Sequence, residues 1–203
     1  MHNYLALGDS YTIGEGVTPE LNFPNKIAKK LRARNIEVAT PKIIAVTGWT
    51  TAELKTAIAT AEEAKPLDKY TFSTLLIGVN NQYRGQDIAI FKKEFTELLS
   101  FAIEHTIGGA KNVYVLSIPD WGVTPFAKEK DSNQIAEEIS NYNNNKKTIA
   151  ENYNCHFIDI TPSTIAHGNL PEYLVEDLLH YNDKEYEIWA QKASDCILKN
   201  TNF

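Results

Sequence analysis

The sequence predicts a three-layer α/β/α fold around a parallel β-sheet. Short apolar runs alternate along the chain with longer amphipathic segments, and this alternation is typical of βαβ units. Hydrophobic residues make up 43% of the 203 positions, which is enough for a sizeable core without disulfides or metals. Because the chain has no internal repeat and no linker rich in glycine, serine or proline, we expect residues 1–203 to form a single domain.

Short apolar runs bounded by polar residues, glycine or proline predict the strands. They are Tyr4–Leu7, Lys42–Val46, Phe72–Ile77, Asn112–Leu116 and His156–Ile158. Helical patterns cover Asn25–Arg34, Thr51–Glu63, Asp87–His105, Asp131–Tyr153 and Asp183–Lys199. The prolines expected in loops are Pro66, Pro119, Pro125, Pro162 and Pro171. An asparagine-rich run, residues 141–145, lies in the fourth helix, where we expect a solvated face.

The charge and hydropathy of the chain exclude two classes of partner. Its 26 acidic and 20 basic residues give a net charge of -6 without a basic face, so we do not expect nucleic acid as a partner. No segment approaches the ~20 apolar residues of an integral membrane span. The first strand begins too early for a signal peptide to precede it, so we expect a cytoplasmic protein, or a secreted or periplasmic one if a leader was removed.

The cysteines and most histidines predict no metal site. Cys155 and Cys196 lie in no C-x-x-C pattern, and we expect both to pack as small hydrophobic residues. The scattered histidines, none of which forms an i, i+4 pair, are His2, His105, His156 and His167. We therefore expect neither a metal nor another cofactor.

A serine among glycines follows the first expected strand. Gly8-Asp9-Ser10 is followed by Gly14 and Gly16, and glycines permit the sharp turn that would present the Ser10 hydroxyl at the end of the strand. Taken alone, the segment fits a phosphate-binding loop or a simple turn equally well. The spacing of the glycines is not the G-x-G-x-x-G of a dinucleotide loop.

Asp177 and His180 lie three residues apart before the last expected helix. A serine hydroxyl needs an imidazole to take its proton, and a carboxylate fixes the tautomer of that imidazole. On a tight turn, Asp177 can reach Nδ1 of His180 and leave Nε2 facing the serine. Such pairs also occur as surface ion pairs or caps, and Asp120, after the fourth expected strand, is a spare carboxylate.

Two further segments could stabilise a negatively charged oxygen. Gly48 follows the second expected strand, and Asn80 follows the third, in Gly78-Val79-Asn80-Asn81. Acyl transfer passes through a tetrahedral oxyanion, which N–H donors stabilise. The backbone N–H groups of Ser10 and Gly48, together with the Asn80 amide, would form such an oxyanion hole.

Together, in their order and strand context, these four segments resemble the SGNH hydrolases, the GDSL-like esterases and lipases, over essentially the whole chain. The resemblance implies a single SGNH hydrolase-like catalytic domain with a flavodoxin-like, five-stranded parallel sheet. The implied roles are nucleophile and first oxyanion donor for Ser10, second donor for Gly48, third donor for Asn80, base for His180 and orienting carboxylate for Asp177. Asn81 stands where the family usually has Asp, which puts the support of that loop in doubt.

The expected reaction is hydrolysis of a carboxylic ester of a small molecule through an acyl-serine intermediate. No segment is left over for a large lid, which favours short-acyl or acetyl esters. The alternatives are a lysophospholipase- or thioesterase-type acyl hydrolase and a non-catalytic, ligand-binding flavodoxin-like domain. Trp49, Tyr83 and Trp121 lie in loops at the expected site, where they would line the substrate cleft or pack beneath the loops. Arg84 is expected to face solvent.

Overall fold

The computed structural model describes residues 1–64 and 67–203. Its strands form one five-stranded sheet in the order β2-β1-β3-β4-β5. The strands are β1 (Tyr4–Gly8), β2 (Lys42–Ala45), β3 (Phe72–Leu76), β4 (Val113–Leu116) and β5 (His156–Ile158). All neighbouring pairs run parallel. The flavodoxin-like order and the parallel sheet confirm the predicted fold class, and each strand lies within one residue of its expected bounds.

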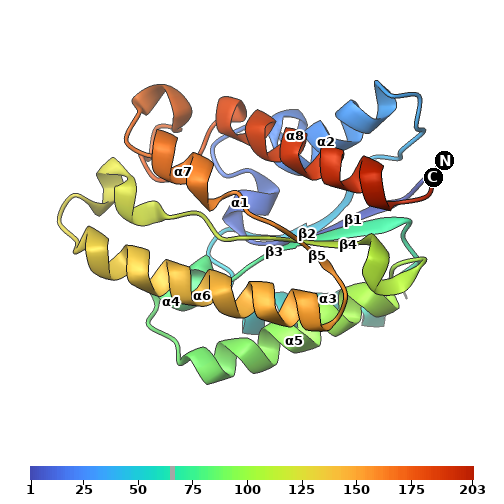
Figure 1. Ribbon diagram of the computed structural model, residues 1–203, viewed down its shortest axis with the longest axis horizontal. Coiled ribbons are helices and arrows are strands. Elements are labelled where there is room, and N and C mark those ends of the chain that lie inside the picture. Colours follow the sequence, from blue (N-terminus) through green and yellow to red (C-terminus); the bar gives the residue numbers. More distant parts are fainter. Residues whose placement is uncertain (65–66) are drawn as a thin grey trace.

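Helices cover both faces of this sheet (Figure 1). On one face lie α1 (Ser10–Ile13), α2 (Phe23–Arg32), α7 (Thr161–His167) and α8 (Asp183–Asn200). On the other face lie α3 (Thr51–Ala64), α4 (Val79–Tyr83), α5 (Ile88–Glu104) and α6 (Ser132–Asn152). Helix α2 packs against α8, and α5 packs between α3 and α6. Both chain termini lie together at the end of the sheet where β1 begins.

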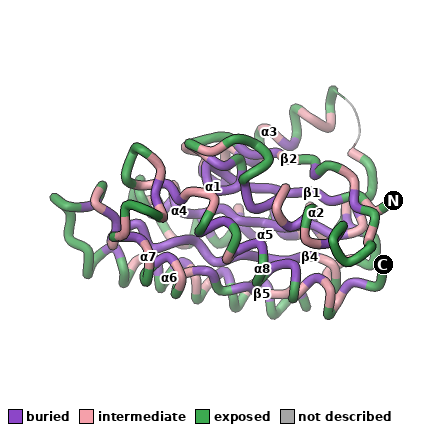
Figure 2. The backbone as a smooth tube through the Cα atoms, turned by 90° about the horizontal axis from the view of Figure 1, so that it is seen from above, coloured by how far each residue is buried: buried purple, intermediate pink, exposed green. Residues whose placement is uncertain are grey.

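The core follows the middle of the sheet. Every residue of β1, β3 and β4 is buried, because these strands are covered by helices on both faces. The edge strand β2 begins exposed, and β5 is half-buried at its start. Figure 2 shows buried backbone along the central strands and exposed residues along the outer helices. A sheet covered on both faces explains why continuous apolar runs, rather than alternating ones, identified the strands.

The long helices agree with their expected bounds to within two residues. Several of these helices have polar N-cap residues, whose side chains accept hydrogen bonds from free N–H groups of the first turn. Asn22 caps α2, Asp87 caps α5, Asp131 caps α6 and Asn182 caps α8. No helix of the described residues has the length and hydrophobicity needed to cross a lipid bilayer.

Several segments that we expected to be loops contain short helices. Helices α1, α4 and α7 were not predicted, and Pro162 lies in the first turn of α7. Pro125 and Pro171 likewise begin 3-10 helices, Pro125–Ala127 and Pro171–Tyr173. The fixed φ of proline suits a first helical turn, where its missing N–H costs nothing. Pro66 lies outside the described residues.

The further 3-10 helices are Pro19–Leu21, Gly109–Asn112 and Trp121–Val123. The asparagine-rich run departs from its expected solvated face. Tyr142 within it is buried, and the Asn143 side chain bonds to both the N–H and the carbonyl of Ile118. Asn141 and Asn144 are exposed, so only part of this run faces solvent.

Candidate active site

A cleft of about 210 Å³ opens at the carboxyl ends of the strands. Three segments that follow the first three strands supply Ser10 after β1, Gly48 after β2 and Asn80 after β3. The segment that leads into α8 adds His180 from far along the sequence. The structure therefore brings four of the expected site residues to one cavity, at the sheet edge where open α/β folds bind ligands.

The serine, histidine and aspartate form a continuous chain of hydrogen bonds. Ser10 Oγ lies 2.9 Å from His180 Nε2, and His180 Nδ1 lies 2.6 Å from Asp177 Oδ2. Ser10 is the first residue of α1, and only 3% of its surface is exposed. This geometry allows a proton to pass from the hydroxyl to an imidazole that the carboxylate holds in one orientation.

A tight turn fixes the Asp177 carboxylate. Asp177 Oδ1 accepts the backbone N–H groups of Leu179 and His180, both at 2.9 Å, while Leu178 adopts a left-handed φ of 58°. Burial raises the pKa of Asp177, but the hydrogen bonds from His180 and Leu179 outweigh it and hold this pKa below its ordinary value. The carboxyl group is therefore ionised and directed at the imidazole at neutral pH.

The expected N–H donors line the same cleft. Gly48 adopts a left-handed φ of 85°, which strains any other residue type. Asn80 Nδ2 donates one hydrogen to the carbonyl of Trp49 at 2.9 Å. A primary amide carries two N–H hydrogens, so the second is free to meet a ligand oxygen.

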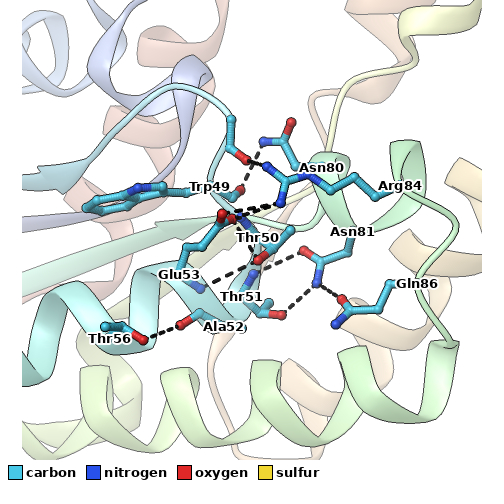
Figure 3. Close-up of polar contacts among 11 residues, drawn as sticks. Trp49, Thr50, Thr51, Ala52, Glu53, Thr56, Asn80, Asn81, Arg84 and Gln86 are labelled. Atoms are coloured by element: carbon cyan, nitrogen blue, oxygen red, sulfur yellow. Dashed lines mark hydrogen bonds and ion pairs between the residues drawn. The ribbon is translucent and has the colours of Figure 1, made fainter.

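A polar network joins the loop of Gly48 to the helix of Asn80 (Figure 3). Arg84 Nη2 donates to the Gly48 carbonyl at 2.6 Å, and Arg84 Nη1 lies 3.2 Å from Glu53 Oε1. Glu53 in turn accepts the N–H of Thr50 at 2.7 Å, which caps α3. Arg84 was expected to face solvent, and its side chain is indeed 49% exposed, yet its guanidinium also holds two segments of the site together.

The hydrogen bonds of Asn81 show how the segment after β3 is supported without the Asp that the family usually has at this position. Asn81 is fully buried, and its amide accepts the N–H of Thr51 at 3.1 Å and donates to Thr51 Oγ1 at 2.7 Å. It also donates to the Gln86 side chain (Figure 3). An ionised Asp could only accept hydrogen bonds, whereas Asn both accepts and donates. Asn81 therefore supports this loop by a pattern that the amide specifically permits.

Aromatic residues form one wall of the cleft. Tyr83 and Trp121 both line it and meet edge to face at 5.2 Å between ring centroids. Phe126, which also lines the cleft, packs on Trp121 at 6.2 Å. The remaining lining residues are Tyr11, Thr47, Val79 and Leu179.

The third aromatic residue expected at the site lies elsewhere. Trp49 does not line this cleft; its side chain borders a separate depression on α3 with Ala52 and Thr56. Only its carbonyl, which accepts the Asn80 amide, contributes to the site.

The spare carboxylate, Asp120, serves as a helix cap. Its Oδ1 accepts the N–H of Gly122 at 2.8 Å, and its own N–H donates to Thr164 Oγ1 at 3.1 Å. Burial raises the pKa of Asp120, against the opposing effect of the Gly122 N–H. The carboxylate that accepts the hydrogen bond from His180 Nδ1 is that of Asp177.

Lys146, a fully buried lysine on α6, was not among the residues predicted from the sequence. The apolar stripe of this helix, which includes Ile135, Ile139 and Ala150, passes through position 146 at helical spacing and could have revealed it. Within the described residues, no group of three or more His, Cys, Asp or Glu side chains is arranged to hold a metal ion.

The chain belongs to the GDSL-like lipase/acylhydrolase family, whose model matches residues 6–188. A Ser-His-Asp triad and an oxyanion hole are typical of this family. Membership assigns the chain to the acyl hydrolases, enzymes that act on carboxylic esters of small molecules. No curated protein matches the chain.

Solved structures of the same fold include esterases and lipases. The psychrotrophic esterase EstA from Pseudoalteromonas sp. is 16% identical, with 98% of each chain covered and a TM-score of 0.73. A lipase/acylhydrolase from Enterococcus faecalis is 21% identical over 100% of this chain and 98% of its own, with a TM-score of 0.71. The acetyl xylan esterase AlAXEase is 19% identical over 96% of this chain and 99% of its own, also with a TM-score of 0.71. At these low identities, the likeness shows only that the fold is shared.

Proposed function

We propose that this chain is a serine esterase in which residues 1–203 act as one catalytic domain and Ser10 is the nucleophile. The observation that carries the proposal is the chain of hydrogen bonds from Ser10 Oγ through His180 to Asp177, at 2.9 and 2.6 Å. A phosphate-binding loop or a non-catalytic ligand-binding domain would have no use for a buried imidazole between a hydroxyl and a carboxylate.

The first half-reaction forms the acyl enzyme. Ser10 Oγ attacks the ester carbonyl carbon while His180 Nε2 takes the hydroxyl proton, and Asp177 stabilises the resulting imidazolium. The carbonyl oxygen becomes an oxyanion, which accepts hydrogen bonds from the backbone N–H groups of Ser10 and Gly48 and from the Asn80 amide. Collapse of this intermediate breaks the bond to the alcohol, which leaves with the proton held by His180.

The second half-reaction releases the acid. Water enters the site, gives a proton to His180 Nε2 and attacks the acyl carbon of Ser10. The same donors stabilise the second oxyanion. The bond to Ser10 Oγ then breaks, and the proton returns from His180 to the serine. The cycle consumes one water per ester and requires no cofactor.

The cleft favours short acyl groups, because its volume of about 210 Å³ is small and one side is closed by Tyr83, Trp121 and Phe126. We propose that these residues contact the substrate and that acetyl and other short-acyl esters are the best substrates. A fold neighbour is an acetyl xylan esterase, in keeping with this size. Turnover that rises steadily from acetyl to dodecanoyl esters would instead indicate a lysophospholipase- or thioesterase-type acyl hydrolase.

Labelling with a fluorophosphonate tests the proposal. The reagent phosphonylates an activated serine, and a structure of the neighbouring esterase EstA is described as inhibited by monoethylphosphonate. We expect modification at Ser10, detected by peptide mass spectrometry, and none in Ser10→Ala. The matched control is Ser194→Ala, which removes a buried hydroxyl on α8 and should leave the labelling unchanged. An unlabelled wild-type protein would favour the non-catalytic binding domain.

A further inference from the structure

The buried lysine on α6 faces the sheet beneath the candidate site. None of the Lys146 side chain is exposed, although a buried ammonium loses the hydration that stabilises its charge. Burial lowers the pKa of Lys146 to about 7, and the negative charge of Asp9 opposes this shift. An apolar residue at position 146 would pack against the sheet without the cost of burying a charge. The lysine at this position therefore points to a specific role.

The ammonium contacts the carboxyl ends of two strands. Lys146 Nζ donates to the carbonyl of Ile77 at 3.0 Å and to that of Leu116 at 2.8 Å, and it lies 5.6 Å from the ring centroid of Phe95. Ile77 follows β3 and immediately precedes Gly78, which begins the segment of the Asn80 amide. The lysine thus holds the backbone that leads into α4, the helix that carries one proposed oxyanion donor.

The second charged group in this region is next to the nucleophile. Asp9 is fully buried, and its Oδ1 accepts the N–H of Tyr11 at 3.1 Å, which caps the helix that begins at Ser10. Its Oδ2 has no hydrogen-bond partner among the described residues. Burial raises the pKa of Asp9 to about 7, whereas the Tyr11 N–H and the charge of Lys146 act in the opposite direction. The two buried groups therefore stabilise each other's charges.

We infer that Lys146 is a positioning residue of the esterase proposed above. Its hydrogen bonds to the carbonyls of Ile77 and Leu116 fix the backbone immediately before Gly78 and α4, the helix that carries Asn80. The Asn80 amide is one of the groups proposed to meet the reacting carbonyl, so this buried side chain positions an oxyanion donor from the sheet side of the site. Lys146 does not line the cleft and acts only through the backbone that leads into α4.

The replacement of Lys146 by Met tests this inference, because Met has a similar length without charge or donors. A misplacement of about 1 Å at reacting groups lowers turnover about 100-fold. We expect Lys146→Met to lower kcat for an aryl acetate and the rate of Ser10 phosphonylation by about 10- to 100-fold, with KM within about threefold of wild type. The control is Lys147→Met, one residue along α6, where the side chain is 56% exposed; both rates should stay within about twofold.

The melting temperature of each variant separates positioning from stability. If Lys146→Met changes the melting temperature but leaves both rates near those of wild type well below it, Lys146 has only a structural role and the inference is wrong. If wild type and Lys147→Met also fail to label at Ser10, the proposed function fails instead. The two failures are therefore distinguishable.

A second variant serves if Lys146→Met does not fold. Asp9→Asn with Lys146→Met removes both buried charges at once, while Asn keeps an acceptor for the Tyr11 N–H. We expect its kcat to lie at least about 10-fold below that of Asp9→Asn alone, because the carbonyls of Ile77 and Leu116 still lose their donor. Equal kcat values, or failure of the double variant to fold as well, would assign Lys146 to the folding core and overturn the inference.

Discussion

The replacement of Asp177 by Asn is the perturbation whose effect the structure defines best. The carboxylate accepts the N–H groups of Leu179 and His180 through Oδ1 and faces His180 Nδ1 through Oδ2. An Asn that keeps the two backbone hydrogen bonds turns its NH2 group toward Nδ1. That nitrogen must then accept, so the imidazole carries its proton on Nε2 and cannot take one from Ser10.

The expected loss of kcat in Asp177→Asn follows from the cost of holding His180 in the wrong tautomer. In a fully buried triad this change lowers kcat by about 10⁴-fold. The Asp177 side chain is 42% exposed, so water can partly relieve the mismatch. We therefore expect a loss of about 10³-fold, which corresponds to about 4 kcal/mol of transition-state stabilisation. KM should change little, because Asp177 does not line the cleft.

Steady-state hydrolysis of an aryl acetate measures this loss. The matched control is Asp120→Asn, since Asp120 is the spare carboxylate after β4 and its Asn can still accept the Gly122 N–H. We expect the control to stay within about threefold of wild type. An inactive Asp120→Asn together with an active Asp177→Asn would refute the assignment of the orienting carboxylate.

Three further predictions concern other groups of the site. Asn80→Ala should lower kcat by about 10²- to 10³-fold with little change in KM, as measured by steady-state kinetics. Asp9 is protonated more readily in the folded than in the unfolded chain, with a pKa of about 7, so wild type should lose stability relative to Asp9→Asn as the pH rises from about 4 to 7. Urea unfolding at several pH values measures this difference, and a constant or opposite difference would refute it. Tyr83→Ala should widen the cleft and raise kcat/KM for hexanoyl relative to acetyl esters; an unchanged ratio would remove Tyr83 from the acyl-binding wall.

The strands and long helices could be predicted because their signals are local. Leu5, Ala6 and Leu7 form an apolar run because β1 is covered on both faces, and such runs end where the chain leaves the core. Helices α1, α4 and α7 are too short for an apolar periodicity to show, and tertiary contacts determine them. Short segments at the sheet edge were therefore read as loops.

Ser10 and His180 of the candidate site could be predicted because acyl transfer by a serine requires an imidazole as its base. Ser10 and His180 lie 170 positions apart in sequence, yet the structure brings them into hydrogen-bond contact, as expected. Their catalytic roles stay predictions. The orientation of Trp49 could not be foreseen, because the direction of a loop side chain depends on its neighbours in space. The spacing on α6 could have indicated that Lys146 is buried, but the carbonyl groups that Lys146 and Arg84 meet could not be foreseen, because a cation in a sequence gives no sign of its acceptors.

Trapping of the acyl enzyme shows directly whether Ser10 is the nucleophile. The protein is mixed with an activated acetyl ester, quenched in acid within the first turnovers and digested for peptide mass spectrometry. The assignment of Ser10 as nucleophile predicts an acetyl group on Ser10 of the wild-type protein and none on the corresponding peptide of Ser10→Ala. It also predicts more acetyl enzyme in Asp177→Asn if the second half-reaction is slowed further than the first. Ester hydrolysis that persists in Ser10→Ala, or an acetyl group that accumulates on another residue, would contradict it.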